Sequence, residues 1–568
     1  MNDGPPGVLV SFTDGPSSDV IGLIVGELPP DVAIIAVCAF GTSPASERAT
    51  VTLDQADYTL RTGHANVKLH VNIFETRTIP KGSVTVLGAV SSVGITRVLR
   101  KRVTGPVQDF YDLYHRPRDP RRNAKLVPYS GRVFDHLEIQ NAIDASLDFW
   151  LTPGPWSEEF AGQLASFLGV RQTVLTNSGS SANLLAMSAL RSPLLGDRAI
   201  PAGSEVITCA TGFPTTINPI LQNDCRPVLV DVNPVSGNAS AAALRAAVTG
   251  KTRAVILAHT LGNPFDLSAV GELCREYGLW FIEDACDALG STYAGRPVGS
   301  FGDLSTLSFY PAHHITTGEG GAVNVRDNPL LMRAVLSLRD WGRDCWCQPG
   351  QDNICGKRFS SDFGDLPHGY DHKFIYTHIG YNLKMTDLQA AIGCAQFAKL
   401  GEFCASRRRT WLGLREVFAR YADHFELPVA APDSDPSWFG FKVMLGRSAP
   451  FTRDQIVGFL ETKGVQTRGI FGGNVLRQPA YRDLAAAGRL RVAGDLTGSD
   501  RLMNDAFFIG VYPGIEPAHV DYVRQVLDGF FEEFATGFAR APSRAELRSA
   551  ARALSPHPRA LGRPRGTV

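Results

Sequence analysis

The sequence predicts an α/β protein built on a mostly parallel sheet with helices on both faces. Between about residues 173 and 340, short apolar strands alternate with helical stretches, as in successive βαβ units. After Met385 the helices lengthen, and strand-like segments at 436–445 and 465–471 indicate a smaller second domain. The first 105 residues differ from both parts, because short β-favouring runs there lie between Gly, Pro and Asp turns.

Composition narrows the function classes. The 568 residues include 56 basic and 56 acidic side chains, and this balance gives no support for nucleic-acid binding. No run approaches 18 apolar residues, and no basic segment opens the chain, so we expect neither a membrane span nor a signal peptide. Ten cysteines in a chain this long indicate reduced thiols of a cytoplasmic protein, unless some bind metal.

The chain divides into five stretches in order. Residues 1–105 form the β-rich region, which carries no chemical motif, with strands expected at 8–12, 32–40, 49–53, 67–74 and 83–87. Residues 106–124 are basic and contain prolines, which is typical of a linker. A large domain is expected at 125–395 and a small C-terminal α/β domain at 396–540. Residues 541–568 are rich in Arg, Ala and Pro, and we predict that they are disordered.

Within the large domain, helical spacing first appears at 137–150 and 156–168. The expected strands follow at 173–176, 205–208, 227–231, 254–258, 279–283, 304–310 and 322–325.

The motif at 177–183, Asn-Ser-Gly-Ser-Ser-Ala-Asn, follows the first of these strands and opens a helix. Backbone N–H groups at a helix start, together with serine hydroxyls, form an anion site. Gly-Ser turns before helices are also common without any ligand.

The stretch 308–321, Ser-Phe-Tyr-Pro-Ala-His-His-Ile-Thr-Thr-Gly-Glu-Gly-Gly, resembles the sugar aminotransferases that act on nucleotide-linked keto sugars. Those enzymes carry Ser-Phe-x-x-x-Lys and then a glycine-rich return, and their lysine forms an imine with pyridoxal phosphate. His313 stands at the lysine position in this chain. The resemblance runs from about 125 to 535. It implies fold type I of the PLP-dependent transferases, the aspartate-aminotransferase-like fold with a seven-stranded sheet.

The resemblance also implies roles around the cofactor. Gly179, Ser180, Ser181 and Ser308 would hold its phosphate. Phe213 would stack on the pyridine ring, although a core phenylalanine is the alternative. Asp284, at the end of a strand, would pair with the ring nitrogen, so that the protonated ring withdraws electrons.

Histidine in place of lysine changes the expected chemistry. An imidazole forms no stable imine, but it titrates near neutrality and moves protons. We therefore expect a noncovalent cofactor, pyridoxamine phosphate (PMP), with His313 as its acid/base catalyst. Asp287 would orient His313, with a surface salt bridge as the alternative, and Tyr310 is a further catalytic candidate. A structural histidine in a turn is the alternative for His313.

The run 380–391, Gly-Tyr-Asn-Leu-Lys-Met-Thr-Asp-Leu-Gln-Ala-Ala, also matches the family. There the asparagine reaches the phosphate in the neighbouring subunit. Asn382 therefore implies a homodimer with shared sites, and a plain strand-to-helix junction is the alternative.

Four cysteines form a candidate metal set. Cys345, Cys347 and Cys355 give C-x-C-x7-C, and Cys286 lies two residues after Asp284. Four thiolates hold either zinc or an iron–sulfur cluster, and spacing alone does not choose. Together with Tyr-Pro-Ala-His-His at 310–314, the set resembles the CDP-6-deoxy-L-threo-D-glycero-4-hexulose-3-dehydrase branch of the family. This implies one [2Fe–2S] cluster.

The resemblance implies C3 dehydration of a CDP- or dTDP-linked 4-keto-6-deoxyhexose, on the way to a 3-deoxy sugar. The electrons would come from an NAD(P)H-dependent flavin/iron–sulfur reductase. Arg468 and Arg477 are candidates for the substrate diphosphate, since guanidinium groups bind phosphate oxygens well. The alternatives are a sugar aminotransferase, which the missing lysine disfavours, and a relative whose thiols bind structural metal.

Overall fold

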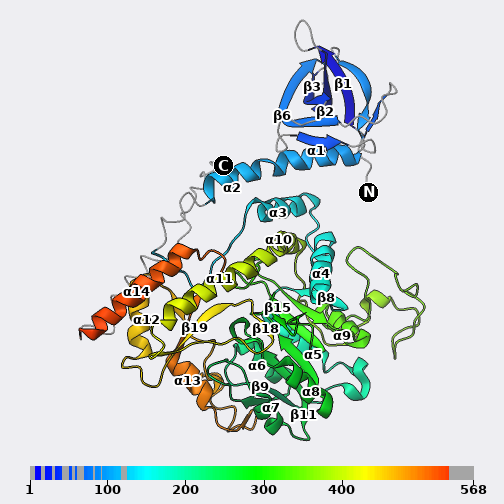
Figure 1. Cartoon of the computed structure of the whole chain (residues 1–568). Helices are drawn as coiled ribbons and strands as arrows, with labels where there is room; N and C mark the ends of the chain where they lie inside the picture. The colour runs from blue at the N-terminus through cyan, green and yellow to red at the C-terminus, as the bar shows by residue number, and fades with distance from the viewer. Residues whose placement is uncertain are drawn as a thin grey trace, which may run out of the picture. The chain divides into compact units, whose positions relative to one another are not determined.

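The computed structural model of the chain describes residues 7–13, 19–27, 32–40, 50–53, 58–60, 69–80, 84–90, 92–116 and 125–536 (Figure 1). These fall into two compact units. One combines the chain up to Arg116 with Asp135–Phe149, and the other combines Pro117–Phe134 with the chain from Trp150 onward. The tail expected at 541–568 lies outside the described residues. Among the described helices, none is both long and apolar enough to cross a lipid bilayer.

The first unit contains one antiparallel seven-stranded sheet, in the order β4-β6-β3-β2-β1-β7-β5. Two of its strands were not predicted: β2, whose apolar run is interrupted by glycines, and β5, which is only three residues long. The strands are β1 (Gly7–Thr13), β2 (Asp19–Glu27), β3 (Val32–Phe40), β4 (Thr50–Leu53), β5 (Tyr58–Leu60), β6 (Leu69–Pro80) and β7 (Val84–Val90).

Three helices complete this unit: α1 (Ser92–Thr104), α2 (Pro106–Tyr114) and α3 (His136–Asp148). The linker predicted at 106–124 is therefore wrong for its first half, and residues 117–124 lie outside the described part. Pro106 starts α2 because proline is well tolerated in the first turn of a helix, where its missing N–H costs nothing.

The second unit is organised around an eight-stranded sheet, in the order β21-β10-β9-β11-β12-β15-β16-β8. Neighbouring strands from β21 to β15 are parallel, whereas β16 runs antiparallel to both of its neighbours. Seven strands are the predicted ones, and the eighth, β21, joins the edge from a distant part of the chain. The strands are β8 (Gln172–Thr176), β9 (Glu205–Cys209), β10 (Arg226–Val230), β11 (Thr252–Ala258), β12 (Trp280–Asp284), β15 (Leu304–Ser308), β16 (Gly321–Val325) and β21 (Arg491–Ala493).

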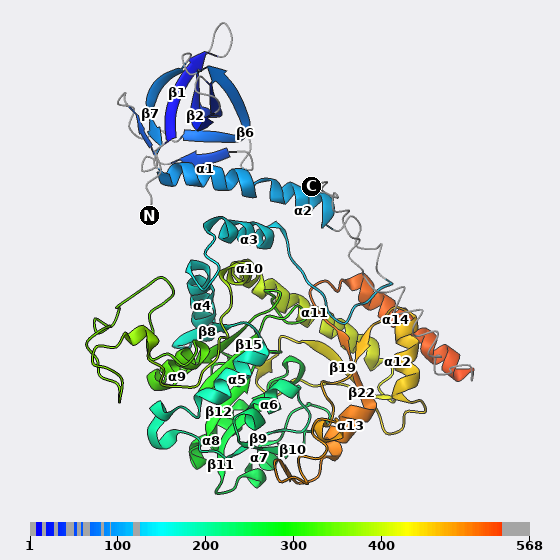
Figure 2. The same ribbon diagram turned by 180° about the vertical axis from the view of Figure 1, so that it is seen from behind.

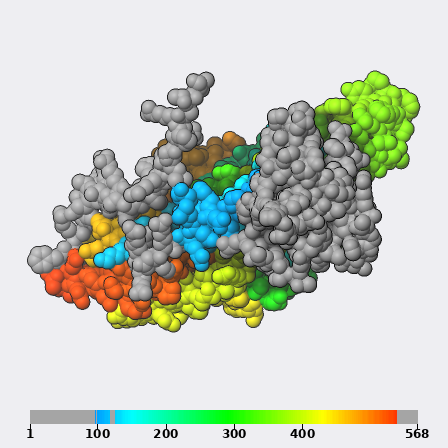
Figure 3. Space-filling model, turned by 90° about the horizontal axis from the view of Figure 1, so that it is seen from above, coloured from blue at the N-terminus to red at the C-terminus, as the bar shows by residue number. Residues whose placement is uncertain are grey.

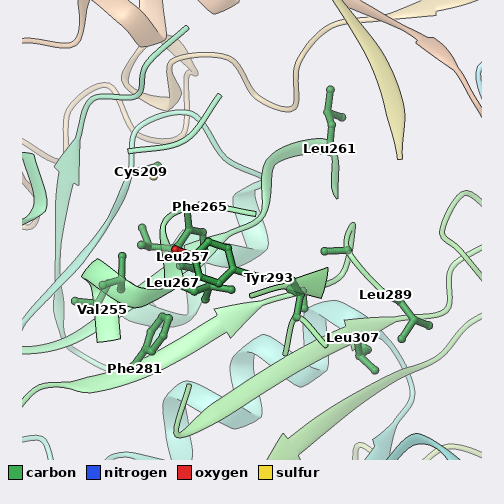
Figure 4. Close-up of a cluster of buried hydrophobic side chains, with 14 of the residues drawn as sticks. Cys209, Val255, Leu257, Leu261, Phe265, Leu267, Phe281, Leu289, Tyr293 and Leu307 are labelled. Carbon is green, nitrogen blue, oxygen red and sulfur yellow. The ribbon is translucent and has the colours of Figure 1, made fainter. Parts of the chain in front are cut away.

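Helices cover both faces of this sheet, as predicted. On β11, Val255 and Leu257 enter one apolar core, which Figure 4 shows with Phe281 and Leu307 of neighbouring strands. Ala254 and Ile256 enter the core of the opposite face. Such alternation follows from the two-residue period of a strand. The helices are α4 (Pro155–Leu168), α5 (Gly179–Ala189), α6 (Pro214–Gln222), α7 (Ala241–Ala247), α8 (Leu267–Tyr277), α9 (Pro329–Arg339) and α10 (Asp387–Phe397).

A separate core lies in the later part of this unit, around Trp411, Phe441 and Phe507. It packs between helices and a four-stranded antiparallel sheet in the order β17-β19-β22-β20, and Figure 2 labels its central strands beside α12 and α14. This core supports the predicted small domain, whose boundary at 395/396 stays a prediction. The elements are α11 (Leu400–Ala419), β17 (Phe425–Glu426), β19 (Gly440–Leu445), α12 (Arg453–Thr462), β20 (Thr467–Arg468), α13 (Thr497–Asp505), β22 (Ala506–Gly510) and α14 (Pro517–Ala535).

Candidate active site

A cavity of about 340 Å³ opens at the carboxyl ends of the parallel strands. Ligands of open α/β sheets bind at this edge, where the loops after neighbouring strands meet. Side chains from β20 and β22 of the small sheet complete its wall. Of the predicted site residues, it is lined by Gly179, Ser180, Phe213, Asp284, Cys286, Asp287, Ser308, Tyr310, His313 and Arg468.

Asp284, the last residue of β12, is a buried carboxylate with its partners in place. Its Oδ2 accepts hydrogen bonds from Asn183 Nδ2 (2.8 Å) and Thr216 Oγ1 (2.7 Å). Its Oδ1 accepts a longer bond from the N–H of Cys286 (3.3 Å). Within the described residues no basic side chain forms an ion pair with Asp284. A buried anion without a cation is costly, so this carboxylate suits a protonated ring nitrogen.

Gly179 and Ser308 form a tight corner at the start of α5. A Cβ on Gly179 would lie 2.5 Å from Ser308 Cβ, so only glycine lets the helix start approach β15 this closely. Helix geometry leaves the first N–H groups of α5 without intrahelical partners. Ser181 differs from its neighbours, because its N–H donates to Ser178 Oγ (3.0 Å) and its Oγ accepts from the Ser178 hydroxyl (2.9 Å). The corner therefore offers Gly179, Ser180 and Ser308 to an anion, and the role of Ser181 stays a prediction.

His313 pairs with Asp287, as the sequence suggested. Its Nδ1 lies 3.3 Å from Asp287 Oδ1, and only 16% and 11% of the two side chains are exposed. Burial raises the pKa of Asp287, and the neighbouring imidazole partly offsets that rise. A carboxylate on one ring nitrogen leaves the other nitrogen of His313 for proton transfer.

Aromatic side chains make up much of the remaining wall. Phe213 and Tyr310 are half-exposed, at 53% and 51%, which disfavours the core role considered for Phe213. Phe439 lies beside His313, with ring centroids 5.4 Å apart. The Arg468 guanidinium stacks 3.8 Å above the ring of Tyr129 and faces the cavity.

Arg477, the other diphosphate candidate, is already engaged. Its guanidinium forms two hydrogen bonds to Asp500, Nε to Oδ1 (2.9 Å) and Nη2 to Oδ2 (2.6 Å). Asn382 is exposed and lies away from the cavity wall, where it forms a backbone bridge with Asp340.

The cysteine loop, residues 343–376, is a long excursion after α9. The lime-coloured chain around residue 350 forms a projecting lobe in Figure 3. Asp344 bonds to Ile375 at its neck (N to O, 2.9 Å), and Arg358 bonds to Asp371 within it. Cys345 and Cys347 are two residues apart in the loop, and burial raises the pKa of the Cys345 thiol.

Cys355 and Cys286 are placed differently. Cys355 Sγ lies 3.5 Å from His372 Nδ1, and this contact lowers the pKa of the thiol. Cys286 lies on the cavity wall, where burial raises the pKa of its thiol well above the usual range. In the part of the chain that the structure describes, no three His, Cys, Asp or Glu side chains gather around one metal position. As placed, the four cysteines therefore do not form a cluster site.

Several residues that build the site were not predicted from the sequence. Asn183 ends the quoted motif at 177–183, and Thr216 lies three residues after Phe213; their polar side chains on apolar helices signal buried partners. Tyr129 and Phe508 line the wall from far apart in the chain, and no local pattern marks them.

Residues 134–528 match the DegT/DnrJ/EryC1/StrS aminotransferase family. The chain belongs to this family. A similar relative is the lipopolysaccharide biosynthesis protein RfbH of Salmonella typhimurium, 48% identical over 433 residues, 76% of this chain and 98% of the relative. Another is the dTDP-4-dehydro-2,6-dideoxy-D-glucose 3-dehydratase of Saccharopolyspora spinosa, 48% identical over 431 residues, 76% of this chain and 92% of the relative.

Among solved structures, the E. coli GDP-4-keto-6-deoxy-D-mannose 3-dehydratase with bound hydrated PLP superposes with a TM-score of 0.63. It is 26% identical and covers 71% of this chain and 100% of its own. The predicted family, fold class and enzymatic nature of the chain are thereby confirmed. The assignment to the CDP-linked branch stays a prediction.

Proposed function

We propose that this chain is a PMP-dependent 3-dehydratase of a nucleotide-linked 4-keto-6-deoxyhexose. The observation that carries the proposal is His313, paired with Asp287, at the position of the family's lysine in a cavity with Asp284 and Ser308. The named 3-dehydratases among the relatives support the same reaction class.

The residues of the cavity fit the cofactor. Asp284 would hold the ring nitrogen protonated, Gly179, Ser180 and Ser308 would hold the phosphate, and Phe213 would stack on the ring. Bound PMP supplies a primary amine that condenses with the sugar C4 ketone, and a ring that accepts electrons. His313, held by Asp287, would remove a proton from C4′, the cofactor carbon that bears the amine.

Replacing the C3 hydroxyl by hydrogen consumes two electrons and two protons and releases water. We assign the electrons to a separate NAD(P)H-dependent flavin/iron–sulfur reductase. The proposal also includes one [2Fe–2S] cluster, which the C-x-C-x7-C spacing and Cys286 support. In the described part of the chain the four thiols are not gathered around one position, so none of the residue roles above depends on this cluster.

The same proposal covers the substrate and the assembly. Arg468, on the cavity wall, suits the diphosphate of a CDP- or dTDP-linked sugar. Exposed Asn382 would reach the cofactor phosphate of a second copy in a cytoplasmic homodimer. The product would be a 3-deoxy sugar for a surface polysaccharide or a glycosylated natural product.

A nucleotide-sugar aminotransferase is the second candidate, because the family is named for that activity. It needs a lysine that bonds to the cofactor aldehyde. Among the described residues that line the cavity there is no lysine. Lys384 lies elsewhere, stacked 3.4 Å above the Trp341 ring and 3.5 Å from Asp340.

One experiment separates the candidates. Protein purified without air is incubated with PMP, reductase, NADH and a panel of CDP-, dTDP- and GDP-linked 4-keto-6-deoxyhexoses. A dehydratase yields a sugar lighter by one oxygen atom in the mass spectrum, whereas an aminotransferase yields an amino sugar when an amino donor is added.

Borohydride reduction of the PLP-loaded protein gives an independent check. We expect no peptide with a reduced pyridoxyl-lysine. A stoichiometric label on any lysine, Lys384 included, would refute the noncovalent cofactor.

A further inference from the structure

Arg407 is a buried cation next to the cavity that neither the proposed chemistry nor the sequence motifs use. It lies on α11, and only 1% of its surface is exposed. Burial lowers its pKa to about 10, so the guanidinium remains charged at neutral pH. A buried charge is costly unless its donors are bonded and an opposite charge is near. The groups that Arg407 contacts therefore indicate why a cation is buried here.

The guanidinium of Arg407 bonds two main-chain carbonyls that meet at the proposed base. Its Nη2 donates to the carbonyl oxygen of His313 (3.0 Å), and its Nη1 donates to that of Trp438 (3.2 Å). The residue after Trp438 is Phe439, whose ring packs against the His313 imidazole. One side chain thus ties the loop that carries the base to the segment that packs against the base.

The charge of Arg407 also acts on two titratable groups beside His313, Asp287 and His314. Among the described residues, no carboxylate makes an ion pair with Arg407. Its charge nevertheless reaches Asp287, where it opposes the rise in pKa that burial causes. Burial lowers the pKa of His314 well below the usual range, and the charge of Arg407 adds to this, so the cation favours a neutral neighbour.

We propose that Arg407 is a positioning residue for proton transfer at His313. By holding the main-chain carbonyls of His313 and Trp438, it fixes where the imidazole lies relative to Asp287 and Phe439. The inference rests on the proposed function, because it assigns His313 the transfer of the C4′ proton. Misplacing a catalytic group by a fraction of an ångström slows a reaction without weakening ligand binding.

Arg408 provides a matched control on the same helix. It also donates to two carbonyls, Gly290 (3.1 Å) and Asp435 (3.2 Å), and its Nε pairs with Asp435 Oδ1 (2.8 Å). These contacts lie away from His313, so Arg408→Gln removes a comparable set of bonds without touching the base.

The experiment compares the parent with Arg407→Gln, Arg407→Lys and Arg408→Gln. Three quantities are measured: the midpoint of thermal unfolding, the PMP dissociation constant by absorbance titration, and substrate-dependent release of tritium from PMP labelled at C4′. We expect Arg407→Gln to bind PMP within about threefold of the parent and to release label at least tenfold more slowly. Arg407→Lys should lie between the two, because lysine keeps the charge and bonds one carbonyl, and Arg408→Gln should release label at the parental rate.

The outcomes separate the two proposals. If the parent itself releases no label, the proposed function fails. If the parent does, and folded Arg407→Gln matches its rate, Arg407 does not position the base. Equal slowing in Arg407→Gln and Arg408→Gln with weakened PMP binding indicates general packing and overturns the inference. Should Arg407→Gln fail to fold, a folded Arg407→Lys that releases label at the parental rate overturns it as well.

Discussion

The His313 cavity and the cysteine loop both gather polar side chains outside regular structure, but only the cavity is assembled in advance. In the cavity, Asp284 already accepts three hydrogen bonds, and His313 already faces Asp287. In the loop, Cys355 contacts His372, whereas Cys286 lies outside the loop on the cavity wall. Strand ends fix the first site because the sheet positions them. The thiols of the loop have no such frame, and the proposed cluster would have to gather them as it binds.

The largest effect should come from His313→Gln. Removing the general base should slow tritium release from C4′ by about 10²- to 10⁴-fold. PMP binding should hold, because Asp284 and Ser308 are unchanged.

His314→Gln is the matched control for that variant. His314 is buried, with Nε2 2.7 Å from the carbonyl oxygen of Ser437. Its loss should lower the free energy of unfolding by about 1–3 kcal/mol and leave label release within threefold of the parent. Slower release in His314→Gln than in His313→Gln would mean that the neighbouring histidine is the base.

The next largest effect should come from a cysteine of the loop and should leave the cavity unchanged. Cys347→Ser should remove the visible absorbance and the paramagnetic signal of the reduced cluster, and with them the 3-deoxy product. Tritium release and PMP affinity should stay within about twofold, since the loop forms no part of the preassembled cavity. The measurements are iron analysis, electron paramagnetic resonance and label release on protein prepared without air.

Cys225→Ala serves as its control, because that thiol is buried outside the loop. It should keep the cluster. If the parent protein contained one zinc and no iron, the proposed redox role of these cysteines would be wrong.

Asp287→Asn should have a smaller effect within the cavity. An asparagine keeps the shape but no longer stabilises a protonated His313, so label release should fall by about 10- to 100-fold. The PMP dissociation constant should change little. An unchanged rate would leave the 3.3 Å contact a structural salt bridge.

The smallest effect tests the small sheet, in which β19 pairs with β22, the strand that carries the cavity-wall residue Phe508. Lys442 on β19 is 4% exposed, its Nζ donates to the carbonyl of Val235 (2.6 Å), and burial lowers its pKa to about 7. The folded pKa lies below the unfolded value, so the unfolded chain binds more protons between about pH 7 and 10. This group's contribution therefore makes stability rise with pH across that window, by at most about 1.4 kcal/mol per pH unit.

Lys442→Met should flatten that slope in urea unfolding followed from pH 7 to 9.5. Parallel stability curves for variant and parent would show that Lys442 titrates alike in the folded and unfolded chain.

Much of the fold was predictable because the large sheet obeys local rules. Its buried strands appear as apolar runs, and Asp284 and Ser308 appear as polar residues at strand ends. The exception, β21, spans three half-buried residues, and pairing with β10 creates it. The linker prediction failed for α2, because a basic, proline-containing composition does not exclude a helix that begins at its proline.

The site was predictable only where one residue type carries the chemistry. His313 stands out because it replaces a lysine within a motif. Asn183 and Thr216 act by bonding Asp284 across 101 and 68 residues of chain, and Arg407 acts through a backbone carbonyl. Such partnerships depend on tertiary distance, which motif spacing does not encode. The loop cysteines show the opposite case: their spacing predicts a shared metal site, but their thiols are not gathered around one position in the described structure.

The corner of Gly179, Ser308 and Gly321 also has a consequence for biosynthesis. A Cβ on Gly321 would lie 2.4 Å from the carbonyl oxygen of Ser178, so β16 runs directly beneath the turn that opens α5. That turn is held at the sheet edge by β8, whose pairing partner β16 is made about 145 residues later. On the ribosome, the corner proposed to hold the phosphate therefore cannot form until residues 321–325 have emerged and paired. Capture of the proposed cofactor would therefore wait until more than half of the 568 residues are made, and a truncated product that ends before β16 would not hold it.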